Sequence, residues 1–255
     1  MKRAVFHELF ESSGPIILPV IHVISKAQAA ININTLIDAN IKGCFLINHD
    51  FDVITFLPII QSIRRSYPDF WIGVNFLGVT GLEAFPILAS LKDEGCRIDA
   101  YWGDDARIDE HELRQAEAEA IAKTRKECGW TGLYFGGVAF KKQRPVNPKN
   151  YGKSAMLAAD YMDVVTTSGL ATGNAAEISK IATFRSALPD TPIALASGIT
   201  PENAIDYKAM DCFMVATGIN FDDDFYNIDV KKLNLLISQC QKMKGTIDDE
   251  NQIGQ

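Results

Sequence analysis

Eight short apolar runs recur along the chain, and their regular spacing is the feature that most restricts its fold. The first run begins at Ile16 and the eighth at Asp211, so that a new run starts about every 28 residues. The runs lack strict apolar–polar alternation, which is typical of parallel strands buried on both faces. We predict strands over Ile16–Val23, Gly43–Asn48, Trp71–Leu77, Arg97–Trp102, Gly132–Phe140, Asp163–Ser168, Pro192–Ser197 and Asp211–Thr217.

The segments between these runs have the periodicity and end signals of helices. Apolar residues recur at helical spacing, and Gly95 and Gly129 follow two segments as C-caps. We predict helices over Ala27–Asn40, Asp52–Arg65, Leu82–Glu94, Asp109–Cys128, Lys149–Asp160, Ala175–Ala187, Pro201–Met210 and Asp229–Lys244. A strand–helix unit repeated in this way, without a long linker, predicts a single α/β domain, a (β/α)8 TIM barrel over residues 1–245. The polar, aperiodic residues 246–255 are expected to form a flexible tail.

Composition and charge exclude several classes of partner. With 47% hydrophobic and 22% charged residues, the chain can bury a large core. The formal net charge of −7 creates no field that attracts nucleic acid or an anionic membrane. The apolar stretch Ile16–Ile24 is too short to cross a bilayer, and the first residues do not form a signal peptide. We therefore expect a soluble cytoplasmic protein that binds a small molecule, with homo-oligomerisation left open.

The cysteines indicate a reducing compartment. The chain has five of them, an odd count, and they form neither a CxxC pair nor a Cys/His cluster. We expect five free thiols and no zinc or iron–sulfur site at Cys44, Cys96, Cys128, Cys212 and Cys240.

Polar residues follow most of the predicted strands. The C-terminal ends of barrel strands meet at one mouth, where such barrels hold their ligands. These polar residues are His22, Asn48, His49, Asp50, Asn75, Tyr101, Trp102, Asp104, Asp105, Lys141, Lys142, Thr166, Thr167, Ser168, Ser197 and Thr217. Any one of them can instead cap a helix, but their convergence on one rim favours a ligand site.

Two glycine turns, after the seventh and eighth strands, predict a phosphate site. In the segment Ala196–Asn203, Gly198 permits close backbone approach and Pro201 suits the first position of a helix. Backbone N–H groups and a helix N-terminus at this place bind phosphate, whereas the alternative is two tight structural turns. We assign phosphate binding to Ser168, Gly169, Ser197, Gly198, Ile199, Thr217 and Gly218. We expect Gly198→Val to weaken phosphate binding more than folding.

Four residues are candidates for catalysis: His22, Asn48, Asp50 and Lys141. His22 ends the first strand on the same face as Val20, so it is expected to face the mouth, with Asn48 or Asp50 fixing its tautomer near a useful pKa. Lys141 suits a Schiff-base or electrostatic role, although it can equally be part of a solvated cationic rim.

Other ionisable residues are assigned no chemistry. His7 and His111 lie in polar segments and are interpreted as incidental. Asp50, Asp52, Asp104 and Asp105 could supply oxygen ligands to a divalent cation, but they are dispersed and some can cap helices. We therefore assign no metal ligand and no certain cofactor, and a divalent cation is the less favoured alternative.

Three segments of the C-terminal third carry recognisable motifs: Asp163–Gly173, Ala194–Asn203 and Phe213–Gly218. They resemble the BtpA/SgcQ family of TIM-barrel proteins, whose pattern is a strand ending in (S/T)G-x-(A/T)TG, a GSG(V/I)T-x-EN turn and an IVGT turn. Weaker matches to the family lie at Leu18–His22, Ile72–Leu77 and Val138–Lys141. The resemblance spans residues 14–240 and implies a TIM barrel.

The chain also departs from the family pattern. Val23–Lys26 replaces a PLPGSP stretch, Ile47-Asn48 replaces a Glu-Asn pair, and Gly137 and Ala139 stand at acidic and histidine positions. The phosphate end is thus retained while part of the polar rim differs. Because the family's name comes from photosystem I accumulation and other members look like carbohydrate-pathway proteins, the resemblance implies no particular reaction.

Two functions follow from these observations. The first is an enzyme acting on a phosphorylated small molecule, a sugar phosphate or nucleotide-like compound, by isomerase, lyase or glycosyl-transfer chemistry. The alternative is a non-catalytic BtpA-like binding or assembly factor that retains a phosphate site.

Overall fold

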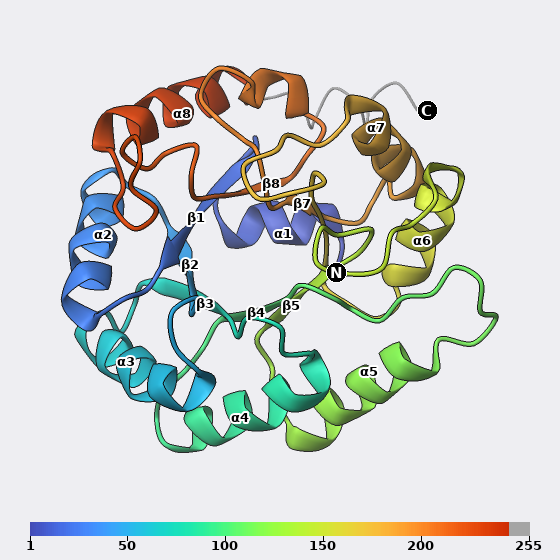
Figure 1. Cartoon of the computed structure of the whole chain (residues 1–255), viewed down its shortest axis with the longest axis horizontal. Helices are drawn as coiled ribbons and strands as arrows, with labels where there is room; N and C mark the ends of the chain where they lie inside the picture. The colour runs from blue at the N-terminus through green and yellow to red at the C-terminus, as the bar shows by residue number, and fades with distance from the viewer. Residues whose placement is uncertain (245–255) are drawn as a thin grey trace.

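The computed structural model describes residues 1–244 and confirms the predicted barrel. Within these residues, parallel strands pair in chain order and β8 closes onto β1. Figure 1 looks into this barrel, with the helices arranged around the strands. The strands are β1 (Ile16–His22), β2 (Gly43–Ile47), β3 (Trp71–Asn75), β4 (Ala100–Gly103), β5 (Leu133–Gly137), β6 (Val164–Thr167), β7 (Ile193–Leu195) and β8 (Cys212–Val215).

Helices connect the strands in the predicted order. The α-helices are α1 (Arg3–Leu9), α2 (Lys26–Asp38), α3 (Val53–Ser66), α4 (Gly81–Asp93), α5 (Ala116–Cys128), α6 (Tyr151–Ala158), α7 (Ile178–Ala187) and α8 (Val230–Lys242). Two short 3₁₀ helices, η1 (Pro148–Asn150) and η2 (Ala204–Tyr207), precede α6 and follow β7. Local caps explain several of the starts: Ser25, for example, accepts a hydrogen bond from the backbone N–H of Gln28 at the beginning of α2.

The barrel has one core between strands and helices and a second inside the strands. Bulky side chains such as Phe45 and Phe135 fill the interior. Their size requires small partners: a Cβ at Gly73 would lie 2.3 Å from the Phe45 ring, so only glycine fits on β3 at this level. The interior is therefore closed below the C-terminal mouth.

Helix α1, which the sequence analysis did not predict, covers the N-terminal end of the barrel. Phe6 and Phe10 are buried, with ring centroids 6.0 Å from Phe135 and 5.3 Å from Trp71, respectively. Trp71 is the first residue of β3, which places α1 opposite the mouth. Its seven residues are too few to show a helical period in the sequence.

Several predicted elements differ from the structure, and three of these errors have identifiable reasons. The helix predicted over Asp109–Cys128 begins only at Ala116, because the Gln115 side chain bonds the backbone of Asp109 and holds the preceding residues in a loop. The strand predicted over Gly132–Phe140 ends at Gly137, and the chain turns at Ala139, whose φ is 47°.

The third error affects the predicted phosphate site. In place of the helix predicted over Pro201–Met210, the structure has only the short η2. The Asn203 side chain accepts from the N–H of Thr200 and donates to the carbonyl of Gly198, so the segment forms a side-chain-stabilised turn instead of a helix N-terminus. No helix dipole therefore points at this turn.

Two further observations concern membrane-spanning helices and the redox state of the cysteines. Among residues 1–244, no helix is both long and apolar enough to cross a membrane. All five cysteines are free, as predicted. The tail predicted over residues 246–255 lies outside the described residues.

Candidate functional site

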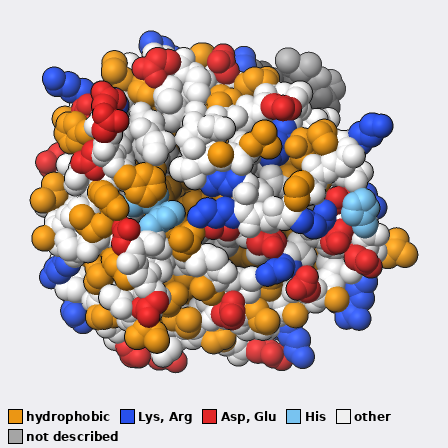
Figure 2. Space-filling view, in the orientation of Figure 1, with side chains coloured by type: hydrophobic (Ala, Val, Ile, Leu, Met, Phe, Trp, Pro, Cys, Tyr) orange, Lys and Arg blue, Asp and Glu red, His pale blue; other side chains and the backbone are white. Residues whose placement is uncertain are grey.

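A polar cavity opens at the C-terminal mouth of the barrel. Its floor is the top layer of the barrel interior, including Val20 and Met214, and its walls come from the loops that follow the strands. Figure 2 shows Lys or Arg and His side chains together at the centre of this face. Seven of the residues predicted for the site line this cavity: His22, Lys141, Ser197, Gly198, Ile199, Thr217 and Gly218.

The two glycine turns lie directly against each other. A Cβ at Gly218 would lie 1.9 Å from the carbonyl oxygen of Ile199, so the turn after β8 packs on the turn after β7 without space for a side chain. Gly198 has a φ of +69°, and a Cβ there would lie 2.2 Å from the backbone nitrogen of Ala175. The loops after β6, β7 and β8 therefore form one interlocked wall.

This contact corrects the expectation for Gly198→Val. A valine would clash with the Ala175 backbone and occupy a left-handed conformation, so it would disrupt the fold itself. The variant therefore cannot separate binding from folding.

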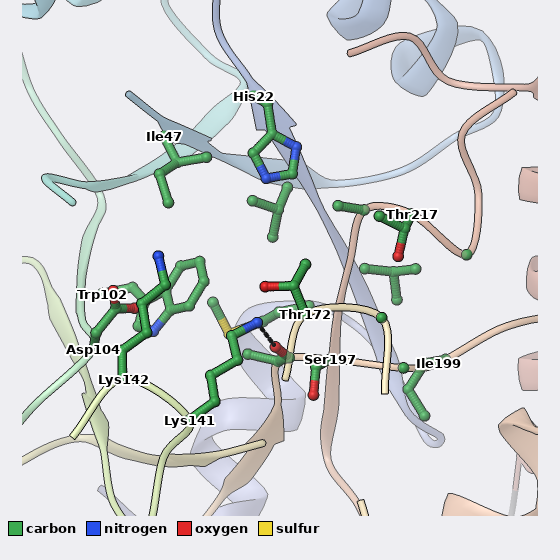
Figure 3. Close-up of a pocket in the computed structure, with 18 of the residues that line it drawn as sticks. His22, Ile47, Trp102, Asp104, Lys141, Lys142, Thr172, Ser197, Ile199 and Thr217 are labelled. Atoms are coloured by element: carbon green, nitrogen blue, oxygen red, sulfur yellow. Dashed lines mark hydrogen bonds between the residues drawn. The ribbon is translucent and has the colours of Figure 1, made fainter. Parts of the chain in front are cut away.

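The backbone of these turns offers hydrogen-bond donors to the cavity. Within residues 1–244, none of the hydrogen bonds is donated by the N–H groups of Gly198, Ile199, Thr217 or Gly218. The Thr217 side chain is exposed at the same place. Figure 3 shows Thr217 and Thr172 beside the turns. The wall is thus rich in hydrogen-bond donors without an acceptor in the described chain.

Ser168 and Gly169 support this wall and do not line the described cavity. Ser168 accepts a hydrogen bond from the N–H of Lys141 at 2.9 Å, and Gly169 donates its N–H to Oγ of Ser197 at 2.8 Å. The Ser197 hydroxyl in turn donates to the carbonyl of Asn174. These residues join the lysine-bearing loop to the glycine turn.

Two lysines supply positive charge inside an acidic protein. Lys141 and Lys142 follow β5 and line the cavity, and Nζ of Lys141 lies 3.4 Å from the carbonyl oxygen of Ala196. Burial lowers the pKa of Lys141 to about 8, against the opposing effect of Asp104. In Figure 3 both lysines extend toward the centre of the cavity from the side opposite His22.

His22 faces the cavity, as its position on β1 predicts. Its tautomer, however, is set neither by Asn48 nor by Asp50: Nδ1 lies 3.1 Å from the carbonyl oxygen of Phe225, and this contact requires the proton on Nδ1. Burial, with the nearby charges of His49 and the lysines, lowers the pKa of His22 to about 3. The expected pKa near the useful range is therefore wrong, and His22 presents a neutral ring whose Nε2 can accept a hydrogen bond.

Asn48 and Asp50 lie outside the cavity lining. The Asn48 side chain donates from its amide nitrogen to the carbonyl of Phe51 and accepts at its amide oxygen from the N–H of Leu77. It thereby connects the loop after β2 with the loop after β3. Asp50 is exposed, and burial lowers the pKa of the neighbouring His49 against the opposing charge of Asp50. The geometry does not bring either residue together with His22 and Lys141.

The cavity contains residues that the sequence analysis placed only on the polar rim. Trp102 and Asp104, on and just after β4, line it. Their spacing of two residues, which puts both side chains on the inner face of a strand, is a signal that could have identified them. Thr172 and the ring of Phe225, which stacks on His22 with centroids 3.8 Å apart, lie in loops without such a signal.

The aspartates considered as cation ligands have other roles or lie apart. Asp52 caps α3 by accepting from the N–H of Thr55, and Asp105 accepts from the N–H of Arg107. Among the described residues, the group with metal-ligand spacing is Asp109, Glu110 and His111, but Glu110 is already bonded by Arg144 and Ser154. His7, interpreted as incidental, is buried and bonds Asp211.

The closed parallel barrel with its polar mouth defines the chain as a TIM-barrel protein. The chain belongs to the BtpA family, because a model of that family matches residues 46–242. A comparison with curated protein sequences gives no significant match.

Solved structures confirm the fold. A structure described as native KDPGal shares 13% identity and a TM-score of 0.62, covering 89% of this chain and 95% of that one. 2-keto-3-deoxy-6-phospho-gluconate aldolase from Zymomonas mobilis shares 15% identity and a TM-score of 0.58 over 93% of this chain and 97% of that one. Phosphoribosyl anthranilate isomerase from Thermus thermophilus shares 14% identity and a TM-score of 0.56, covering 89% of this chain and 99% of that one.

Proposed function

We propose that the protein is an enzyme acting on a phosphorylated small molecule, whose phosphate group binds at the turns after β7 and β8. One observation carries this proposal. Four residues of the cavity wall, Gly198, Ile199, Thr217 and Gly218, have backbone N–H groups that donate to no acceptor of the described chain. Phosphate oxygens are acceptors that match such a cluster of donors.

The charges of the cavity support an anionic ligand. Lys141 and Lys142 are the cationic side chains of the described lining, and Asp104 is its carboxylate. The excess of positive charge contrasts with the net charge of −7 for the whole chain. A local positive field in an acidic protein attracts a small anion without attracting polyanions such as nucleic acid.

The remaining cavity residues suit proton transfer or carbonyl chemistry. Nε2 of His22 is an acceptor in the neutral ring, and the pKa of Lys141, near 8, leaves part of its amine unprotonated at neutral pH. Isomerisation, aldol-type cleavage and glycosyl transfer all use such groups. The names of two structural relatives, an aldolase and an isomerase of phosphorylated compounds, agree with this class by analogy of fold.

The alternative is a non-catalytic binding factor that retains the phosphate site. It is favoured by His22, because a ring with a pKa near 3 and Nδ1 bonded to a backbone carbonyl is a poor general acid at neutral pH. Turnover distinguishes the two functions: the enzyme converts a member of a panel of sugar phosphates and nucleotides, and His22→Asn lowers that rate by roughly 10²-fold. Saturable binding with no turnover of any member supports the factor.

Calorimetric titration with inorganic phosphate tests the site. We expect saturable binding that Lys142→Met weakens by about tenfold, since one of the two positive charges in the cavity lining is lost. Thr217→Val should weaken binding less, because one neutral hydroxyl is removed. Lys153→Met, at an exposed lysine of α6 outside the cavity, is the matched control and should bind like the wild type. Absence of saturable phosphate binding to the wild type overturns the proposal.

A further inference from the structure

Two residues that line the cavity each have a buried polar atom without a partner in the described chain. Trp102 is 5% exposed and Asp104 is 6% exposed, and both line the cavity. Nε1 of Trp102 and Oδ2 of Asp104 make no hydrogen bond to any residue of the described range. Buried groups of this kind are normally bonded, because an unmade hydrogen bond in the interior costs free energy.

The surrounding residues hold both side chains in place. The indole of Trp102 packs edge-on against Phe45 and Phe140, with ring centroids 6.0 and 5.9 Å away. The amide of Asn75 donates to Oδ1 of Asp104 at 3.1 Å, which orients the carboxylate and leaves Oδ2 for another donor. Burial raises the pKa of Asp104, and the positive charges of Lys142 and Lys141 and the hydrogen bond from Asn75 oppose this effect and favour the ionised carboxylate.

The chemistry of the two atoms selects the group that they bind. An indole N–H can only donate a hydrogen bond, and an ionised carboxylate oxygen can only accept one. A hydroxyl group satisfies both kinds of partner, since it donates and accepts. A carbonyl group would satisfy the indole and leave the carboxylate without a donor, and an alkyl group would satisfy neither.

We infer that Trp102 and Asp104 form a subsite that binds hydroxyl groups on the carbon chain of the phosphorylated ligand, which makes the ligand a phosphorylated polyol or sugar. Figure 3 shows the two side chains at the opposite side of the cavity from Thr217 and the glycine turns. A ligand bound at both ends therefore spans the mouth, with its phosphate at β7 and β8 and its hydroxyl groups at β4. This inference rests on the proposed phosphate site.

A matched pair of ligands tests the subsite. Ribitol 5-phosphate and pentyl phosphate have the same carbon chain and phosphate and differ in their hydroxyl groups. We expect calorimetry to show that the wild type binds ribitol 5-phosphate at least about tenfold more tightly, as hydrogen bonds to a charged group predict. Asp104→Asn and Trp102→Phe should lose most of this preference while keeping their affinity for inorganic phosphate. Asp105→Asn, which changes the adjacent aspartate outside the cavity lining, is the control and should keep the preference. Equal affinities of the wild type for the two esters, or a preference that survives in Asp104→Asn, would overturn the inference.

A second readout separates this inference from the phosphate site. The Nε1–H resonance of Trp102 can be assigned among the three tryptophans by its loss in Trp102→Phe. It should shift with ribitol 5-phosphate and stay in place with pentyl phosphate. If the wild type binds no phosphate at all, the proposed function fails, and the subsite is then judged with ribitol alone: a saturable shift of this resonance supports it, and an unchanged resonance refutes it.

Discussion

His22 donates its Nδ1–H to the backbone carbonyl of Phe225, 3.1 Å away, and the two rings stack with centroids 3.8 Å apart. The two residues are 203 positions apart in the chain, on β1 and in the loop between β8 and α8. Gln28 and Asn32 of α2 donate to the carbonyl of Tyr226 and hold this loop over the barrel mouth. The loop therefore decides which nitrogen of His22 is free to accept a hydrogen bond in the cavity.

The burial of His22 predicts a measurable acid sensitivity. Its pKa is about 3 in the folded protein against an ordinary value of 6.5, so between these pH values the unfolded chain binds the additional proton and stability falls as pH is lowered. The contribution is at most about 1.4 kcal/mol per pH unit. In urea unfolding at pH 7, 5.5 and 4.5, the wild type should lose stability more steeply than His22→Asn. Parallel pH profiles would contradict this assignment.

Lys180 of α7 is predicted to position the loops that carry the site. Its buried ammonium donates to the carbonyls of Ala139 and Ser168 at 2.6 and 2.7 Å. These two hydrogen bonds connect the loop that carries Lys141 with the loop beside Ser197. Lys180→Met should lower the free energy of unfolding by about 1–3 kcal/mol, because two buried carbonyls lose a charged donor. It should also weaken phosphate binding.

Thermal unfolding and phosphate titration of Lys180→Met measure both effects. The matched control is Lys208→Met, because Lys208 is exposed next to η2. A variant that keeps the phosphate affinity of the wild type while losing stability would show that Lys180 supports the fold alone.

Asp211 is predicted to stabilise the opposite end of the barrel without affecting the site. It is fully buried, and its carboxylate contacts Arg3 and Arg185 at 2.5 Å each and His7 at 2.8 Å. Asp211→Asn removes the negative charge that Arg3 and Arg185 face, so we expect a loss of about 3–5 kcal/mol in unfolding free energy. Phosphate affinity at a temperature where the variant is folded should be unchanged. Asp190→Asn, at an exposed position, should change neither quantity, and a stability loss there as large as in Asp211→Asn would refute a specific role for the buried carboxylate.

The cysteines should differ in reactivity according to burial. Titration of the denatured, unreduced protein should find five thiols. In the native protein a thiol reagent should first modify Cys128, the partly exposed one, since the other four are buried. Burial also raises the pKa of the Cys240 thiol to about 12, which leaves little thiolate. Mass mapping of the first adduct checks this order, and early modification of Cys44 or Cys212 would disprove it.

Much of the fold was predictable because its signals are local. Each strand is an apolar run whose neighbours in the barrel are also its neighbours in the chain, so the spacing of the runs determines the topology. The inward face of His22 follows from the two-residue period of β1. The helix predicted over Pro201–Met210 is absent because the Asn203 side chain bonds the backbone N–H of Thr200 and the carbonyl of Gly198. Helical periodicity alone does not reveal such side-chain bonds to the backbone.

By itself the sequence determined the barrel, its glycine turns and the lysine-bearing loop, because periodicity, turn chemistry and the ends of strands depend on residues close in the chain. Only the tertiary structure decided how these parts act together: that Phe225 sets the tautomer of His22, and that Trp102 and Asp104 keep polar atoms without a partner in the described chain. These properties depend on burial and on contacts between segments far apart in the chain, and such contacts leave no pattern along it.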